Sequence, residues 1–454
     1  MMKRLYNFVL SSGKSLGALI LFSFLTTAPT AHAIPSFAQQ TGQPCSACHV
    51  GAFGPQLKPY GRDFKLWGYQ ASDGKSNLVP VAVTNYVSYT HTHAPQYPAA
   101  ARHFADNGNF AIDQTSLYFG GKIAGGFGAF GQVTYDGVGG TFHIDNADVR
   151  KVKALEIGDK DVVIGFDFNN GPGAQDVWQA TPIWTFPYNG SSLSPTPAAS
   201  TVIDGTFAQS AFGTGAYIFW DYTYYAELTA YKALSPVFAG RLGLGENSQS
   251  DVYDRLMPYW RFALNHDFGT KQSLEVGTYG LISTRAPGGV ANSGLDHLDD
   301  VAFDLNYYNQ VVKNQVYSLH GTWIHENQNL SASTVLLGTN PKDRLDTVRA
   351  DLSWAYANTW IPTLQVFSTT GTADKVLYQN GNGSPNSTGY VMELAYVPWG
   401  KSNSPVYWMN FRVAIQYTGY SEFNGTRYRA YDANTTYINF WTAIAPLGWM
   451  VTGR

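Results

Sequence analysis

The sequence predicts an all-β chain, a transmembrane β-barrel of about sixteen strands preceded by a short segment with chemistry of its own. Three observations lead there. Only 13% of the 454 residues are charged, whereas Tyr 30, Phe 26 and Trp 12 are numerous. Beyond residue 33 no apolar stretch approaches the length of a membrane helix. From about residue 78 onward, apolar and polar residues alternate. An exported chain of this kind meets a membrane as a closed barrel.

Residues 1–33 are typical of an export signal. Lys3 and Arg4 supply the positive start, and residues 16–25 form an apolar core too short to span a bilayer. Ala31-His32-Ala33 fits the small-x-small cleavage rule, so the mature chain is expected to begin near Ile34. The net charge of −3 and the lack of a basic run give no sign of a nucleic-acid partner.

Residues 34–77 contain Cys45-Ser46-Ala47-Cys48-His49, the attachment pattern of a c-type haem. Each thiol forms a thioether bond to a haem vinyl group, and His49 coordinates the iron as the proximal ligand. A thioredoxin-like redox pair would sit in a βαβ unit, and a zinc site would need further ligands at matching spacing. Neither context surrounds the motif, and the chain has Cys 2 in total. The sequence therefore predicts one covalent haem c held by Cys45, Cys48 and His49.

The haem segment is too short to bury a core unaided, so it needs the haem and a wall to pack against. Lys58, Arg62 and Lys65 are interpreted either as partners of the haem propionates or as solvated charges. The segment has no Met, which excludes a locally built Met/His ligation.

The sixth iron ligand is therefore borrowed or absent. The candidates are His91 and His93 at the far end of the first strand, and His103 in the loop after it. A haem near the external mouth would reach them, since a strand rises about 3.3 Å per residue. The alternative is that water, or no ligand, occupies the sixth position.

Residues 78–454 are predicted to form the barrel. Apolar residues alternate with polar ones in the segments 301–307, 348–356 and 407–417, which is the strand pattern. In a barrel the apolar face meets lipid and the polar face lines the lumen; the alternative, a soluble all-β fold, has the same periodicity. The residues predicted to point inward, because charge on the lipid face is costly, are Arg261, Asp304, Arg349, Asp351, Glu393 and Arg412.

The lengths of the connections favour the barrel. Predicted strands begin near residues 78, 115, 126, 145, 161, 211, 223, 255, 272, 300, 314, 344, 360, 388, 407 and 435. Short connections (near 125, 221, 269–271, 313, 358 and 401–404) alternate with long ones (94–114, 170–210, 233–254, 285–299, 327–343, 372–387 and 420–434). Short periplasmic turns and long external loops produce this alternation. Trp220, Trp323, Trp360, Trp399, Trp408 and Trp441 near strand ends are interpreted as an interfacial girdle. The predicted location is the bacterial outer membrane.

The N-terminal block resembles the fused monohaem cytochrome–porins, the family that contains outer-membrane iron(II)-oxidising cytochromes. The resemblance is carried by residues 34–42, Cys45 to His49, residues 55–57 and residues 61–69, while the barrel is similar only in layout. Two departures are Gln39, where the family usually has Arg, and about ten residues beyond the expected last strand.

The resemblance implies an oxidoreductase that takes electrons from extracellular Fe(II) and delivers them to a periplasmic c-type cytochrome. Two other hypotheses stay open. The same conduit would serve another electron donor or the reductive direction. A diffusion porin would carry the haem only as a structural part of its N-terminal plug.

Overall fold

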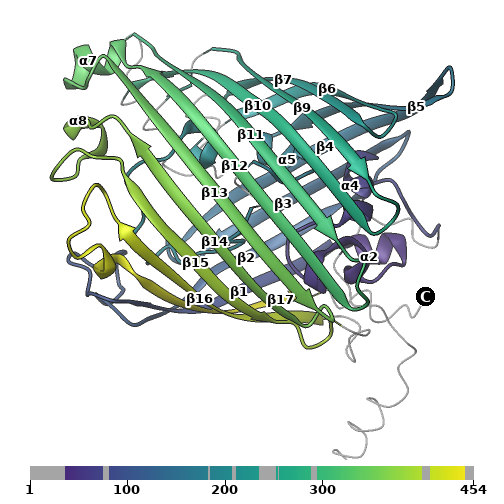
Figure 1. The fold of residues 1–454 in the computed structure, drawn as a ribbon, viewed down its shortest axis with the longest axis horizontal. Coiled ribbons are helices and arrows are strands. Elements are labelled where there is room, and N and C mark those ends of the chain that lie inside the picture. The colour runs from purple at the N-terminus through teal and green to yellow at the C-terminus, as the bar shows by residue number, and fades with distance from the viewer. Residues whose placement is uncertain are drawn as a thin grey trace, which may run out of the picture.

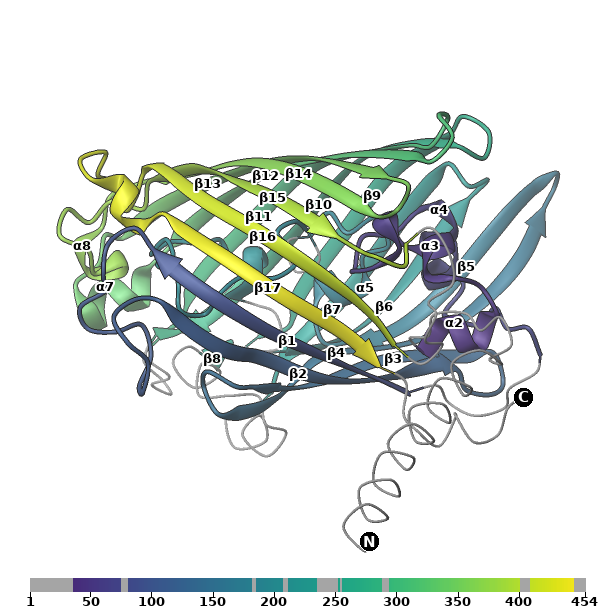
Figure 2. The ribbon, with the colours of Figure 1, turned by 90° about the horizontal axis from the view of Figure 1, so that it is seen from below.

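The computed structural model describes residues 36–74, 81–181, 185–206, 211–234, 252–253, 255–287, 294–400 and 409–444. Within these residues, sixteen antiparallel strands form a closed barrel (Figures 1 and 2), and the two-residue strand β8 pairs with β10 beside β9. Strand β1 hydrogen-bonds to both β2 and β17, so the sheet has no edge. The predicted fold class is confirmed.

Most strands begin within four residues of their predicted starts, and β2 begins six residues before its predicted start. The strand bounds are β1 Val81–Thr92, β2 Asn109–Lys122, β3 Phe127–Asp136, β4 Thr141–Ile157, β5 Lys160–Asn169, β6 Ala211–Trp220, β7 Tyr224–Ala233, β8 Val252–Tyr253, β9 Met257–Asp267, β10 Gln272–Ala286, β11 Asp296–Asn309, β12 Gln315–Asn329, β13 Lys342–Tyr356, β14 Trp360–Gly371, β15 Ser387–Tyr396, β16 Met409–Glu422 and β17 Thr435–Ile444.

Side chains alternate between the two faces of the wall as period two requires. In β11, for example, Val301, Phe303 and Leu305 are exposed on the outer wall, whereas Asp304 and Asn306 are buried inside. The predicted inward orientation is confirmed for Arg261, Asp304, Asp351, Glu393 and Arg412, which are buried, and for Arg349, which pairs with Asp204 inside the lumen. The apolar outer wall suits lipid, and a soluble all-β fold is excluded.

The two ends of the barrel differ in their connections. Turns of a few residues, such as 123–126, 158–159 and 357–359, lie at one end, which we take as periplasmic. Longer connections, such as 93–108 and 372–386, lie at the other end together with helices α7 Ser331–Leu337 and α8 Lys375–Tyr378 (Figure 1). The four residues 137–140 are a short connection at the external end, an exception to the predicted alternation. Among the described helices, none has the length and apolarity needed to cross a membrane.

The connection between β5 and β6 corrects one prediction. Residues 170–210 were expected to be an external loop. The described part of residues 170–206, here called the lumenal segment, instead folds inside the barrel with α5 Pro172–Gln175 and η3 Val202–Thr206. Its backbone N–H groups at Val202 and Ile203 donate to Glu326 and Asp300 of the wall, at 2.5 and 2.9 Å. The polar lumen thus offers acceptors that water would otherwise provide.

Residues 36–74, here called the cap, sit in the periplasmic mouth (Figure 2). The cap contains α2 Ser36–Thr41, α3 Cys45–Cys48, the 3₁₀ turn η1 Val50–Ala52 and α4 Pro59–Leu66. Pro59 begins α4, where its missing N–H costs nothing. The wall holds the end of α4 and the residues after it, because Tyr217 donates to the Leu66 carbonyl and Tyr69 donates to Asp148, both at 2.5 Å.

Several predictions concern residues outside the described ranges. These are the export signal at 1–33, the strand start at residue 78, the turn at 401–404, Trp408, and the residues after 444. The side chain of Gln39 is also outside the description.

Candidate haem site

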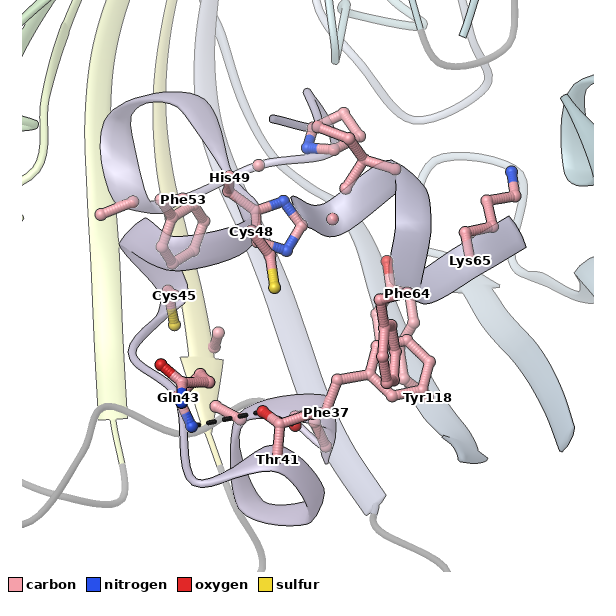
Figure 3. Close-up of a pocket in the computed structure, with 18 of the residues that line it drawn as sticks. Phe37, Thr41, Gln43, Cys45, Cys48, His49, Phe53, Phe64, Lys65 and Tyr118 are labelled. Carbon is pink, nitrogen blue, oxygen red and sulfur yellow. Dashed lines mark hydrogen bonds between the residues drawn. The ribbon is translucent and has the colours of Figure 1, made fainter. Parts of the chain in front are cut away.

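The Cys-x-x-Cys-His motif forms one helical turn that aims its three functional side chains at a single cavity. Cys45 and Cys48 begin and end α3, and residues three apart on a helix lie on the same face. The His49 N–H donates to the Cys45 carbonyl at 2.9 Å, which places the His49 side chain directly after the turn. Figure 3 shows both sulfur atoms and the imidazole directed into the cavity.

The residues after the motif fold back onto it. The N–H of Lys58 donates to the Cys48 carbonyl at 2.8 Å, and the N–H of Val50 donates to the Gln56 carbonyl at 3.0 Å. Helix α4 then approaches so closely that a Cβ at Gly61 would lie 2.5 Å from the Cys48 carbonyl oxygen. Only glycine fits at this position without moving the motif.

The cavity wall is mainly apolar, contains several aromatic rings, and comes from both the cap and the barrel. Phe37 and Phe64 of the cap pack edge to face with ring centroids 5.0 Å apart. Phe53 of the cap packs in the same way on Trp441 of β17, at 4.8 Å. Tyr118 of β2 also lines the cavity. Such a lining suits a flat apolar macrocycle.

Burial sets the protonation of the three motif side chains. It raises the pKa of the Cys45 thiol to about 12 and that of Cys48 to about 11. Reactive redox pairs instead have a cysteine of lowered pKa, so this environment does not favour a thioredoxin-like role. Burial also lowers the pKa of His49 to about 4. The imidazole is therefore neutral at pH 7, which is the form that binds iron.

The residues present fit a covalently held haem. Cys45 and Cys48 would form the thioethers, and His49 would bind the iron. The buried Nδ1 atom of His49 forms no well-aligned hydrogen bond to a described residue, although the backbone of Gly54 and Gln56 lies close enough to favour the protonated ring. The described residues that line the cavity include no second His and no Met.

The three basic residues of the cap are engaged by protein groups. Lys58 donates to the Ser46 carbonyl at 2.8 Å, Arg62 donates to Ser273 of β10 at 2.6 Å, and Lys65 donates to the Asp176 carbonyl at 2.7 Å. They are therefore not simply solvated charges. Lys65 alone among the three lines the cavity, and its amine points away from the thiols in Figure 3. Their main contribution is to join the cap to itself and to the barrel.

The structure does not bring the three candidate distal histidines to the cavity. The cavity touches Ala82 and Thr84 at the periplasmic end of β1, whereas His91 lies seven residues further along, about 23 Å at the usual strand rise. Its side chain is exposed on the outer wall, because it has the opposite parity to Thr84. His93 and His103 are exposed at the external end. A cap held low in the lumen thus leaves all three out of reach.

Sequence reasoning missed the barrel residues that line the site, and Trp441 and Gln179 are two examples. Trp441 was assigned to the interfacial girdle, yet it is only 7% exposed and faces the cavity. The alternation in β17, where Tyr437 and Asn439 are buried inside, would have placed it there. The other residue is Gln179, which reaches the cavity from the lumenal segment. No periodic signal marks that segment.

Comparison with known proteins adds little detail. No family model matches the chain, and no curated protein matches it either. Similar solved structures include the anion-selective porin from Comamonas acidovorans, at 11% identity and TM-score 0.44, covering 81% of this chain and 99% of that one. The outer membrane channel DcaP of Acinetobacter baumannii has 10% identity and TM-score 0.43, covering 81% and 97%. Salmonella typhi OmpF in complex with daunomycin has 11% identity and TM-score 0.42, again covering 81% and 97%.

The assignment of the fold rests on this chain's own strand pairing. A closed sheet, an apolar outer wall and a charged lumen define a porin-like β-barrel of the bacterial outer membrane.

Proposed function

We propose that this chain is a monohaem c-type cytochrome–porin that moves electrons across the outer membrane, oxidising extracellular Fe(II) and reducing a periplasmic cytochrome. The observation that carries the proposal is the convergence of Cys45, Cys48 and His49 on one aromatic cavity within the barrel mouth. A haem bound there would supply a one-electron redox centre. Each Fe(II) ion would give up one electron and become Fe(III).

The chain's own residues have three tasks in this function. Cys45 and Cys48 anchor the cofactor, so that it cannot dissociate into the periplasm. His49 is buried and neutral, and therefore ready to bind iron. Phe37, Phe53 and the other aromatic side chains exclude water from the cavity. Excluding water lowers the solvent reorganisation energy of electron transfer, because fewer water dipoles have to reorient when the charge changes.

The position of the cap sets a requirement on the donor. The cavity lies beside Ala82, and Thr92 at the external end of β1 is about 33 Å further along the strand. We infer a small cation as the donor, because a protein could not enter the lumen; the lumenal wall carries carboxylates such as Asp351 and Glu393, each beside a basic side chain. An electron carrier on the periplasmic side has direct access to the end of the barrel that holds the cap. Both features support Fe(II) outside and a cytochrome inside as the two partners.

Anoxic stopped-flow absorbance of the purified protein tests the proposal. Fe(II) added to the oxidised protein is expected to reduce the haem within a turnover time, and a reduced sample is expected to transfer electrons to a soluble c-type cytochrome. The control is the Cys45→Ala/Cys48→Ala protein, which should show neither change. A haem that stays oxidised in the presence of Fe(II) contradicts the proposed substrate.

A diffusion porin with a haem-bearing plug is the second candidate, because the barrel is porin-like and its mouth holds a folded cap. Proteoliposome swelling separates the two. Solute flux with an inert haem spectrum supports the diffusion porin. Haem reduction by an organic or reduced-sulfur donor instead of Fe(II) supports the same conduit with another donor. Haem oxidation by external Fe(III) supports the reductive direction.

A further inference from the structure

The His49 imidazole lies against a loop whose position depends on the barrel. Residues 54–57 run beside the ring, with the backbone of Gly54 and Gln56 next to it. The Nδ1 atom nevertheless forms no well-aligned hydrogen bond to a described residue. The second ring nitrogen of a metal-bound histidine usually donates to a carbonyl or carboxylate, and that bond tunes the basicity of the ligand. A small shift of the loop would therefore decide whether Nδ1 of His49 can donate to a carbonyl of the loop.

Gln179 of the lumenal segment holds this loop by two hydrogen bonds. Its amide nitrogen Nε2 donates to the Pro55 carbonyl at 2.6 Å, and its oxygen Oε1 accepts from the Leu57 N–H at 2.8 Å. A primary amide carries a donor and an acceptor side by side, so it matches the carbonyl and N–H of residues two apart in an extended chain. Both bonds flank Gln56, whose carbonyl also accepts from the Val50 N–H next to His49.

The turn that presents Gln179 is itself fixed to the barrel wall. The Asp176 carboxylate accepts from the N–H groups of Trp178 and Ala180, at 2.9 and 2.7 Å. Arg261 of β9, which is fully buried, lies 3.6 Å from the same carboxylate. The position of Gln179 is therefore fixed relative to strand β9 through Asp176 and Arg261.

The Gln56 side chain adds a third attachment to the barrel. Its Nε2 donates to Ser318 of β12 at 2.5 Å, and its Oε1 accepts from Tyr188 of the lumenal segment at 2.7 Å. The loop beside His49 is thus held from two directions, the wall and the lumenal segment.

We propose that Gln179 is a positioning residue that sets the orientation and electron-donating strength of His49, and through them the redox potential of the site. This inference rests on the proposed haem function. Gln179 acts through the 54–57 loop and does not touch the iron. The lumenal segment is then a functional part of the redox site, because it fixes the loop that orients the iron ligand.

The experiment compares Gln179→Met with Gln96→Met in the full-length protein. Gln96 is the matched control, because its side-chain amide also donates to the lumenal segment, at the Leu193 carbonyl, but on the external side. The readouts are the haem midpoint potential from an optical redox titration, the iron–histidine stretch of the reduced protein by resonance Raman, and the rate of haem reduction by Fe(II). Haem staining and heat-modifiable gel mobility check attachment and barrel folding.

Gln179→Met is expected to shift the midpoint potential and the iron–histidine frequency, and to change the reduction rate by about tenfold, the usual size of an outer-shell effect. Gln96→Met should match the wild type. If the Gln179→Met protein has the same midpoint potential, iron–histidine frequency and reduction rate as the wild type, the inference about Gln179 is wrong and the proposed haem function is unaffected. A wild type without covalent haem overturns the proposed function instead.

If Gln179→Met does not fold, Ser318→Ala replaces it, since this change removes only the Gln56–Ser318 bond. A midpoint potential of Ser318→Ala that differs from that of the wild type supports the control of His49 through the loop. A potential equal to that of the wild type overturns it.

Discussion

The cap and the lumenal segment both occupy the interior of the barrel, but they are held there by different forces. The cap packs through aromatic side chains, such as Phe53 on Trp441, and through single hydrogen bonds, such as those from Tyr217 to the Leu66 carbonyl and from Arg62 to Ser273. The lumenal segment is held by charges: Asp176 and Asp204 face Arg261 and Arg349 of the wall. The cap therefore presents an apolar cavity suited to a cofactor. The segment instead uses the polar lining of the lumen to fix its own turns.

The largest expected effect is the loss of the cofactor from a protein whose barrel stays folded. Cys45→Ala/Cys48→Ala should lose all haem after acid–acetone extraction, because no thioether remains. The barrel should keep its heat-modifiable mobility on a gel, since the strand pairing does not involve the motif. Haem staining that survives extraction in this variant would falsify covalent attachment at this motif.

A second change tests the charged attachment of the lumenal segment. Arg261 lies 2.8 Å from Glu275 and 2.9 Å from Asp304, and all three side chains are fully buried. Arg261→Met leaves these carboxylates without their cation, so the free energy of unfolding should fall by about 3–5 kcal/mol. Denaturant titration of the protein in detergent measures it.

The control for Arg261 is Lys160→Met. Lys160 pairs with Asp221 at 2.7 Å, but both side chains are about 40% exposed. Its loss should cost less than about 1 kcal/mol. Equal losses for the two variants would mean that the buried ion cluster does not stabilise the barrel.

A third change tests the charged contact of η3, at the C-terminal end of the lumenal segment. Arg349→Met leaves Asp204 buried without its partner, which should cost about 1–3 kcal/mol and loosen η3 from the wall. Single-channel conductance in planar bilayers should rise. Arg427→Met removes the exposed pair with Glu422 and should leave the conductance unchanged. A conductance that responds to Arg427 and not to Arg349 contradicts the role given to the lumenal segment.

The smallest expected effect lies outside both regions. His91→Ala, His93→Ala and His103→Ala should each leave the haem spectrum unchanged, because the three side chains are exposed at the far end or on the outer wall. Visible and near-infrared absorbance would detect a change from low spin to high spin. Such a change in any variant would contradict this prediction and would mean that the substituted histidine binds the iron.

The parts that sequence predicted well are those with a periodic or spaced signal. The starts of β10, β14 and β17 were predicted to the residue at 272, 360 and 435. β2 was placed at 115 but begins at Asn109, because Asp113 and Gln114 resemble a loop although Asp113 faces the lumen and accepts from Tyr437. The haem assignment rests on five residues whose spacing thioether chemistry fixes, and it stays a prediction; the structure shows that Cys45, Cys48 and His49 line one cavity.

The lumenal segment could not be predicted in the same way. Residues 170–206 have no regular alternation, and their position depends on partners such as Asp300 and Glu326 that come more than ninety residues later. The height of the cap was left open by the sequence, because it follows from contacts such as that between Lys65 and Asp176 and not from any local pattern. Three candidate distal histidines were named for a haem near the external mouth, and the structure places them away from the cavity.

The haem cavity lies on the seam where the first and last strands meet. Ala82 and Thr84 of β1 and Trp441 and Ala443 of β17 line it together, and Thr84 is paired with Ala443 in the closing ladder. During biogenesis this wall is complete only when the last strand to be synthesised has joined the first. If the motif carries haem as proposed, the haem would have to be attached before that step, while the two thiols are still accessible from the side that β17 later closes. Insertion into the membrane and maturation of the redox site would then be consecutive steps of one assembly pathway.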